Sequence, residues 1–401
     1  MSAARQSCAS QVVMSIKMVR TFHPVGQGAY YTEQFLRGGR PVFTMAYDCG
    51  STSLTSEELA RVVRTSLPKE TEVDAVFISH FDSDHVNGLP EMFSAFHVRQ
   101  LFLPFLSDSY EMAYWRLKSL ADCGNDFSKA IAYHLLPTSA GGQPLWSEMG
   151  VRDPPRVIWV PPCEHPEGMK DNPVFLGQEK VLRSALGLMR LSVGRQAWVF
   201  EPFNFKRDAR VSGFKEALED ALKKCGAVLP VEQFVANAAM EMKSKGKGKN
   251  LRLLASVDRA LKDKKARDKA FSRRYGSING NSMTLYSGPK APQAGPSASK
   301  HMVGCLYLGD FEGNRKRAWG ALQAYYSQRG YWDLVGCVQL PHHGSKANYN
   351  SDIEKLPACY AVSYGVGNPY GHPDWPTVRR LHSAGHGILL ANEIFFSRMF
   401  V

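Results

Sequence analysis

The sequence predicts an α/β (α+β) protein in which short buried strands alternate with amphipathic helices. Runs of β-branched and other apolar residues recur, as at residues 73–79 and 334–340, and such runs are typical of strands buried on both faces. Between them, segments such as residues 56–66 place apolar residues at helical spacing. Clusters of histidine and aspartate directly follow several predicted strands. Functional residues are therefore expected where loops leave the strands.

The first hundred residues predict a β-rich unit with interposed helices. Strands are expected at residues 16–22, 30–36, 42–48, 73–79 and 98–104. The first two form a hairpin around Val25-Gly-Gln-Gly28, whose glycines allow the backbone angles of a tight turn. Asp48 lies near the end of the third strand. The helix at residues 56–66 has an acidic first turn, and a second helix is expected from Glu91, after the breakers Gly88 and Pro90.

Later framework strands are expected at residues 156–160, 196–200, 282–286, 302–308, 334–340 and 358–363. Helical spacing recurs at residues 318–328 and 377–383, and Pro376 suits the first helical position of the second of these. Residues 287–300 are rich in Gly, Pro, Ala and Ser and predict an unpacked tip between two strands.

The net charge of +12 is concentrated in one segment and predicts a polyanionic partner. Residues 206–274 hold 19 Lys and Arg against 9 Asp and Glu, a net charge of +10. Two amphipathic helices are predicted there by Phe214, Leu218 and Leu222 and by Leu254, Val257 and Leu261. The flexible tract between them offers Lys243, Lys245, Lys247 and Lys249 to nucleic acid. The alternative is a solvated helix face beside a flexible loop.

The chemistry-bearing cluster follows the strand at residues 73–79. His80, Asp82, Asp84 and His85 lie within six residues there. Imidazole nitrogen and carboxylate oxygen together suit zinc, manganese or iron, so the cluster predicts a metal site. The alternative is a solvated polar turn.

His80-x-Asp82-x-Asp84-His85 resembles the H-x-H-x-D-H motif of the metallo-β-lactamase superfamily, with aspartate in place of the second histidine. Further stretches resemble one branch, the hydrolase domain of ComEC-type competence proteins. They are Val25-Gly-Gln-Gly28, Tyr47-Asp48-Cys-Gly50, Leu306-Tyr-Leu-Gly-Asp310, Pro341-His342-His343-Gly-Ser345 and Ser363-Tyr-Gly-Val-Gly-Asn368-Pro-Tyr-Gly-His372-Pro373. The matches occur in the family's order and cover roughly the first and last hundred residues.

The resemblance implies a metallo-β-lactamase αββα sandwich with a helical basic insertion. Residues 1–106 and 277–401 would be its two halves, residues 107–205 a divergent segment with framework strands, and residues 206–276 the insertion.

The resemblance also implies two divalent metal ions, zinc or manganese, with magnesium as a further option. His80 and Asp82 would hold one, Asp84 and His85 the other, and Asp310 would bridge them. One of His342 and His343 would complete the second site, and the sequence leaves open which.

Asp84, Asn368 and His372 are the catalytic candidates that this resemblance implies. The expected chemistry is metal-assisted hydrolysis by an activated water, in which His372 donates to a phosphate or leaving group. The alternative for His372 is a hydrogen-bonded loop histidine. No G-x-S-x-G nucleophile motif is present.

Two departures from the superfamily pattern affect the first metal site. Asp82 stands where the superfamily has its second histidine, and Asn281 or Asn279 stands where it has the histidine of its third motif. Oxygen ligands shift the preference from zinc towards manganese or magnesium. Oxygen ligands can also leave the first metal site weakly occupied. The protein could then lack catalytic activity.

The expected function is that of a soluble, cytoplasmic hydrolase of phosphodiesters, a nuclease acting on DNA or RNA. One alternative is hydrolysis of a small ester, lactone or nucleotide, with the insertion as a lid. Another is a catalytically weakened scaffold that binds nucleic acid or a partner protein. No apolar run approaches the ~20 residues that span a bilayer, and the N-terminal residues lack the apolar centre of a signal peptide. The eight scattered cysteines predict thiols rather than disulfides.

Overall fold

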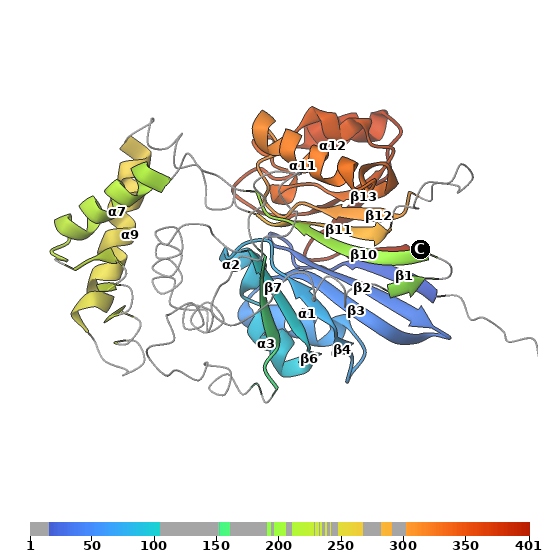
Figure 1. Ribbon diagram of the computed structural model, residues 1–401, viewed down its shortest axis with the longest axis horizontal. Coiled ribbons are helices and arrows are strands. Elements are labelled where there is room, and N and C mark those ends of the chain that lie inside the picture. The colour runs from blue at the N-terminus through green and yellow to red at the C-terminus, as the bar shows by residue number, and fades with distance from the viewer. Residues whose placement is uncertain are drawn as a thin grey trace, which may run out of the picture.

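Two seven-stranded sheets lie face to face at the centre of the described part of the molecule (Figure 1). The computed structural model describes residues 16–104, 151, 153–160, 191–193, 196–205, 211–227, 229–231, 233–234, 237–238, 241, 248–267, 282–290 and 302–401. Helices and strands are mixed along the chain, so the predicted α/β class is confirmed.

The first sheet contains the N-terminal strands and the last strand of the chain. Its order is β16 (Ser397–Phe400), β1 (Ile16–Phe22), β2 (Tyr30–Arg37), β3 (Arg40–Cys49), β5 (Ala75–Phe77), β7 (Gln100–Pro104) and β8 (Arg156–Val160). Neighbours pair antiparallel from β16 to β3 and parallel from β3 to β8. β4 (Glu72–Val73) and β6 (His97–Val98) pair with each other in a separate two-stranded sheet.

The second sheet repeats this division into a parallel and an antiparallel half. Its order is β15 (Ile388–Ala391), β14 (Cys359–Ser363), β13 (Val335–Gln339), β12 (Gly304–Tyr307), β11 (Thr284–Pro289), β10 (Gln196–Phe203) and β9 (Leu191–Val193). Neighbours from β15 to β12 are parallel, and those from β12 to β9 are antiparallel.

Helices cover the outer face of each sheet, so the described part has four layers (Figure 1). α1 (Ser56–Ser66) and α3 (Leu89–Ala95) cover the first sheet, and α11 (Lys316–Gln328) and α12 (Trp375–Ser383) cover the second. Three apolar clusters fill the gaps between layers. The middle cluster joins the sheets through side chains such as Phe35, Phe77, Phe200 and Tyr307. Both faces of each sheet are therefore buried, as the apolar strands require.

Short helices close the loops at the strand ends. They are α2 (Ser83–Val86), η4 (Trp332–Leu334), η5 (His342–Gly344) and η6 (Ser351–Lys355).

The predicted strand at residues 73–79 is divided at Asp74. The Asp74 carboxylate accepts a hydrogen bond from the backbone N–H of Thr44 at 2.8 Å, and its own N–H donates to the Thr44 carbonyl. Residues before this point belong to β4 and residues after it to β5. The chain changes its pairing partners at Asp74, because β4 pairs with β6 whereas β5 pairs with β3 and β7. One apolar run therefore forms two strands.

α7 (Val211–Lys224) and α9 (Lys249–Arg267) lie side by side and apart from the two sheets in Figure 1. Leu218, Leu222, Leu254, Val257 and Leu261 are buried, so the two predicted amphipathic helices are confirmed. Lys249 is exposed at the first residue of α9. The other candidate lysines, Lys243, Lys245 and Lys247, lie outside the described residues, as do Asn279 and Asn281.

Candidate metal centre

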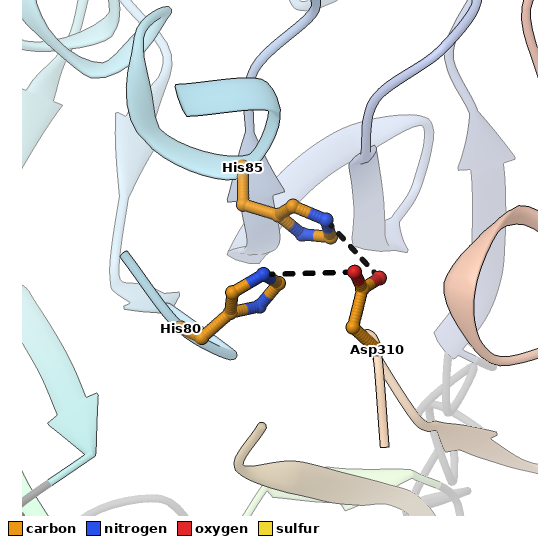
Figure 2. Close-up of side chains that lie close together, drawn as sticks. All are labelled: His80, His85 and Asp310. Atoms are coloured by element: carbon orange, nitrogen blue, oxygen red, sulfur yellow. Dashed lines mark ion pairs between the residues drawn. The ribbon is translucent and has the colours of Figure 1, made fainter. Parts of the chain in front are cut away.

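Loops that leave strands of both sheets meet at one point and bring the predicted ligands together. His80 and His85 come from the loop and short helix after β5, and Asp310 follows β12. Figure 2 shows the three side chains pointing toward one another. We call these residues, together with Asp82, Asp84, His342 and His343, the metal centre.

Asp310 lies between three histidines from two segments of the chain. Its Oδ1 is 3.3 Å from the Nε2 of His85. Its Oδ2 is 3.7 Å from the Nε2 of His80 and 3.5 Å from the Nε2 of His342. The two carboxylate oxygens thus face different histidines.

Asp84 forms the second part of the centre with His85 and His343. Its Oδ2 is 3.2 Å from the Nε2 of His343 and 4.0 Å from the Nε2 of His85. One ligand atom from each of Asp84, His85 and His343 lies within 4.8 Å of the others, and the same holds for His80, His85 and Asp310. Asp82 borders the first group, with its Oδ2 4.0 Å from the Nε2 of His80.

The neighbouring residues His342 and His343 have left-handed backbones, and their side chains face different carboxylates of the centre. His342 has φ 50° and His343 has φ 55°, a conformation that costs a non-glycine residue roughly 1–3 kcal/mol. The turn directs His343 toward Asp84 and His342 toward Asp310. Of the two histidines, His343 is the one that lies beside Asp84 and His85.

Asp48 fixes the ring of His85. Its Oδ2 lies 2.8 Å from the Nδ1 of His85, and its two oxygens accept hydrogen bonds of 2.7 Å from the backbone N–H and the hydroxyl of Ser79. With Nδ1–H donated to a carboxylate, the Nε2 lone pair is directed into the centre. This is the arrangement by which carboxylates orient metal-binding histidines.

Further hydroxyl and amide groups hold the other ligands. The Nδ1 of His80 lies 2.9 Å from the Ser79 hydroxyl and 3.2 Å from the hydroxyl of Ser282. Asn348 lies 3.0 Å from the Nδ1 of His342 through its Oδ1 and donates its Nδ2 to the Asp310 carbonyl at 2.8 Å. His80 and His342 both turn their Nδ1 atoms toward these partners, so their Nε2 atoms face the centre.

The residues present fit a cation. The Nε2 atoms of His80 and His85 are buried and make no hydrogen bond within the described part of the chain, although carboxylate oxygens lie 3.3–4.0 Å away. Buried polar atoms are ordinarily satisfied. A divalent ion held by nitrogen and oxygen ligands would satisfy them, and its ligand set is one that zinc and manganese accept.

The surroundings of the centre keep its carboxylates ionised. Burial acts to raise the pKa of Asp310, but the charges of His85, His342 and His80 outweigh it and hold that pKa well below its usual value. Burial likewise opposes ionisation of Asp84, yet its pKa falls to about 2 because of His85 and His343. Both carboxylates are therefore ionised at neutral pH and offer negative charge to an ion.

Close packing against the end of β3 holds the short helix α2 in place. A Cβ added to Gly50 would lie 2.5 Å from the carbonyl carbon of Asp84 and 2.6 Å from the backbone nitrogen of His85. The Ala29 N–H donates to the Asp84 carbonyl at 3.0 Å. The end of β3 therefore approaches α2 at a distance that only glycine permits.

The loop after β14 places His372 beside the centre. The His372 ring lies 5.1 Å from the His342 ring and 6.2 Å from the His343 ring, measured between centroids. Burial, together with these two histidines, lowers the pKa of His372 to about 4. His372 is consequently neutral at neutral pH and retains one N–H to donate.

Asn368 acts within the same loop. Its Oδ1 accepts hydrogen bonds from the N–H groups of Tyr370 and His372, and its Nδ2 donates to the carbonyls of Gly365 and His372. The structure thus gives Asn368 contacts that position His372, and its predicted catalytic role stays a prediction.

Sequence reasoning assigned no role to Asp48, Ser79, Ser282 or Asn348. Asp48 carried a signal, because it lies at the end of a predicted strand, and the ligand candidates follow theirs. Ser282 and Asn348 carried none, since their roles depend on contacts with His80 and Asp310 across long stretches of sequence.

No protein-family model matches the chain, and no curated protein matches it significantly. Within the part of the chain that the structure describes, every helix is too short or too polar to cross a membrane.

Proposed function

We propose that the chain is a metal-dependent hydrolase of phosphodiesters, a nuclease acting on DNA or RNA, with a metallo-β-lactamase fold of the ComEC-like branch. The observation that carries the proposal is that His80 and His85 meet Asp310 and His343 at one point, although Asp310 and His343 lie more than two hundred residues later in the chain. The four-layer arrangement and the order of the motifs support it.

Two groups of residues would hold the cations. His80 and His342 lie near the Oδ2 of Asp310, with Asp82 beside His80. His85 lies near the Oδ1 of Asp310, and Asp84 lies between His85 and His343. When bound, divalent ions polarise a phosphoryl oxygen and lower the pKa of water toward neutrality.

The chain itself supplies orientation and proton donation. Asp48 keeps His85 in the tautomer whose Nε2 faces the centre. Asp84 stays ionised and can accept a hydrogen bond from a water that attacks the phosphorus. Neutral His372 can donate its N–H to a phosphate oxygen or to the leaving oxygen.

The nucleic-acid part of the proposal is supported by the local charge. Residues 206–274 carry +10 of the net charge of +12, and the described part of α9 exposes Lys249, Arg252 and Arg259. Lysine and arginine gathered in one segment are the electrostatic feature of proteins that bind phosphate backbones.

The test combines metal analysis of the purified full chain with nuclease assays in Mn²⁺, Mg²⁺ and Zn²⁺. Asp84→Ala and His85→Ala should each abolish hydrolysis and leave the circular dichroism spectrum unchanged, because the polar loop contributes less to the core than the strand before it. Asp352→Ala, which removes an exposed carboxylate paired with Lys355, is the control. Turnover that persists in both variants, or after complete metal removal, would place the chemistry elsewhere.

A further inference from the structure

Tyr370 is a large aromatic residue that the fold leaves in solvent next to the metal centre. Its side chain is 69% exposed, whereas the paired tyrosines Tyr30, Tyr31, Tyr325 and Tyr326 are all at most 2% exposed. Packing in the core therefore does not explain why position 370 holds a large aromatic residue.

Three rings lead from the surface to the centre. The Tyr370 ring stacks on His372 with centroids 5.8 Å apart and planes inclined by 29°. The His372 ring stacks on His343 at 6.2 Å and 24°. The Nε2 of His343 in turn faces Asp84 at 3.2 Å. Tyr370 is the exposed end of this column.

The loop that carries Tyr370 is already held in place. Asn368 accepts hydrogen bonds from the backbone N–H groups of Tyr370 and His372 at 3.1 and 3.0 Å, and Gly371 adopts φ 72° between them. A partner that stacks on Tyr370 thus orders little additional backbone, which favours binding.

We infer that Tyr370 stacks on a nucleobase adjacent to the scissile phosphate and so selects nucleic acid over simple phosphodiesters. The inference rests on the proposed function and names the part of its substrate that this face receives. Every base offers a π-face, so an aromatic platform binds single strands with little sequence preference. The Tyr370 ring lies 5.8 Å from the His372 ring, which lies 6.2 Å from the ring of the candidate ligand His343, so a base next to a phosphate bound at the centre is the part of the substrate that faces Tyr370.

The experiment measures binding of a short single-stranded oligonucleotide that contains 2-aminopurine. The full-length protein is held in Ca²⁺, which oxygen ligands bind, and mass spectrometry verifies that the strand stays intact. Loss of base stacking in Tyr370→Ala should weaken affinity roughly 5- to 150-fold and remove the fluorescence quenching. Tyr370→Phe and Tyr370→Trp should retain both, because they keep a ring.

Two controls separate stacking from other effects. Phe400→Ala removes another exposed aromatic, 77% exposed on the edge strand β16, and should bind as the wild type does. An oligonucleotide with abasic sites should bind wild type and Tyr370→Ala equally.

Equal affinity of Tyr370→Ala and wild type for the normal strand would overturn the inference, as would an equal loss for the abasic strand. Absence of oligonucleotide binding by the wild type would overturn it together with the nucleic-acid part of the proposed function. Metal-dependent hydrolysis of a small phosphodiester is measured separately. That assay tests the hydrolase part of the proposed function, and its outcome does not depend on Tyr370.

Discussion

At the scale of the residue, the Asp48 carboxylate fixes the tautomer of His85 and should control how strongly the centre binds metal. Asp48→Asn should lower metal affinity about 10- to 100-fold, because the Nδ1 partner of His85 is lost while the ligands remain. Isothermal titration with Mn²⁺ measures the effect, and circular dichroism checks the fold. Asp74→Asn is the matched control, since Asp74 accepts a backbone N–H in the same sheet. Unchanged affinity in Asp48→Asn would contradict the assigned orientation.

A buried histidine outside the centre should make stability depend on pH. His23 is 4% exposed, stacks on Tyr30 and contacts the Thr32 hydroxyl at 2.8 Å. Burial, and then the charge of Arg398, lowers its pKa from 6.5 to about 3. Between these values the unfolded chain binds a proton that the folded chain does not. His23 therefore makes the free energy of unfolding decrease as pH falls from 6.5 toward 3, by up to about 1.4 kcal/mol per pH unit.

Urea denaturation between pH 7 and pH 4 measures this contribution. His23→Gln should flatten the dependence of the unfolding free energy on pH relative to wild type. His97→Gln, at an exposed histidine, is the matched control. A wild-type slope in the His23 variant would show that the histidine is charged in the folded state.

The candidate ligands that the structure brings together could be predicted from the sequence, because four of them lie in one short motif. The separate roles of His342 and His343 could not, since consecutive rings diverge according to backbone angles that their residue types do not reveal. The exposure of Tyr370 could not be predicted either, because it depends on how the surrounding loops pack.

At the scale of the element, the close approach of β3 and α2 at Gly50 should be essential to the centre. Gly50→Ala places a methyl group against the backbone of Asp84 and His85, so it should displace both ligands and lower metal affinity at least tenfold. The same titration measures it. Gly320→Ala is the control, since a Cβ there meets nothing within 4 Å, and it should stabilise α11 by roughly 0.5–1 kcal/mol. Equal metal affinity in the two variants would contradict the packing argument.

Elements with local signals were predicted closely. α1 begins and ends at the predicted residues, and Thr55 and Glu58 form a capping box at its start. β16 was not predicted, because its place in the sheet comes from pairing with β1 across nearly the whole chain. The division between β4 and β5 was missed for a similar reason, since Asp74 finds its partner in another strand.

At the scale of the whole molecule, the metal centre draws residues from both sheets, so metal should stabilise the folded chain. A ligand at a hundred times its dissociation constant contributes about 2.7 kcal/mol. Mn²⁺ at that level should raise the melting temperature by several degrees, and a chelator should reverse the rise. Differential scanning calorimetry measures it. Asp310→Asn should remove most of the response, and an identical response in that variant would exclude Asp310 as a ligand.

The charge of residues 206–274 should govern binding of nucleic acid. Changing Lys243, Lys245, Lys247 and Lys249 to Ala should weaken duplex binding for every sequence alike. The slope of log affinity against log salt should flatten by up to about 0.9 for each lost phosphate contact. Turnover of a small chromogenic phosphodiester should stay the same.

The two readouts on the quadruple variant distinguish the three roles of the insertion. An unchanged slope and affinity would identify a solvated surface. A larger effect on small-substrate turnover than on binding would identify a lid.

The pairing of β16 with β1 also orders events during translation. A ribosome that has released the first hundred residues has delivered His80, Asp84 and His85, but neither Asp310 nor His343. The outer edge of β1 stays open until residue 400 has left the exit tunnel, and an open strand edge invites pairing with other chains. A nascent chain therefore carries an incomplete centre until residue 343 has emerged, and an unprotected edge of β1 until residue 400 has emerged.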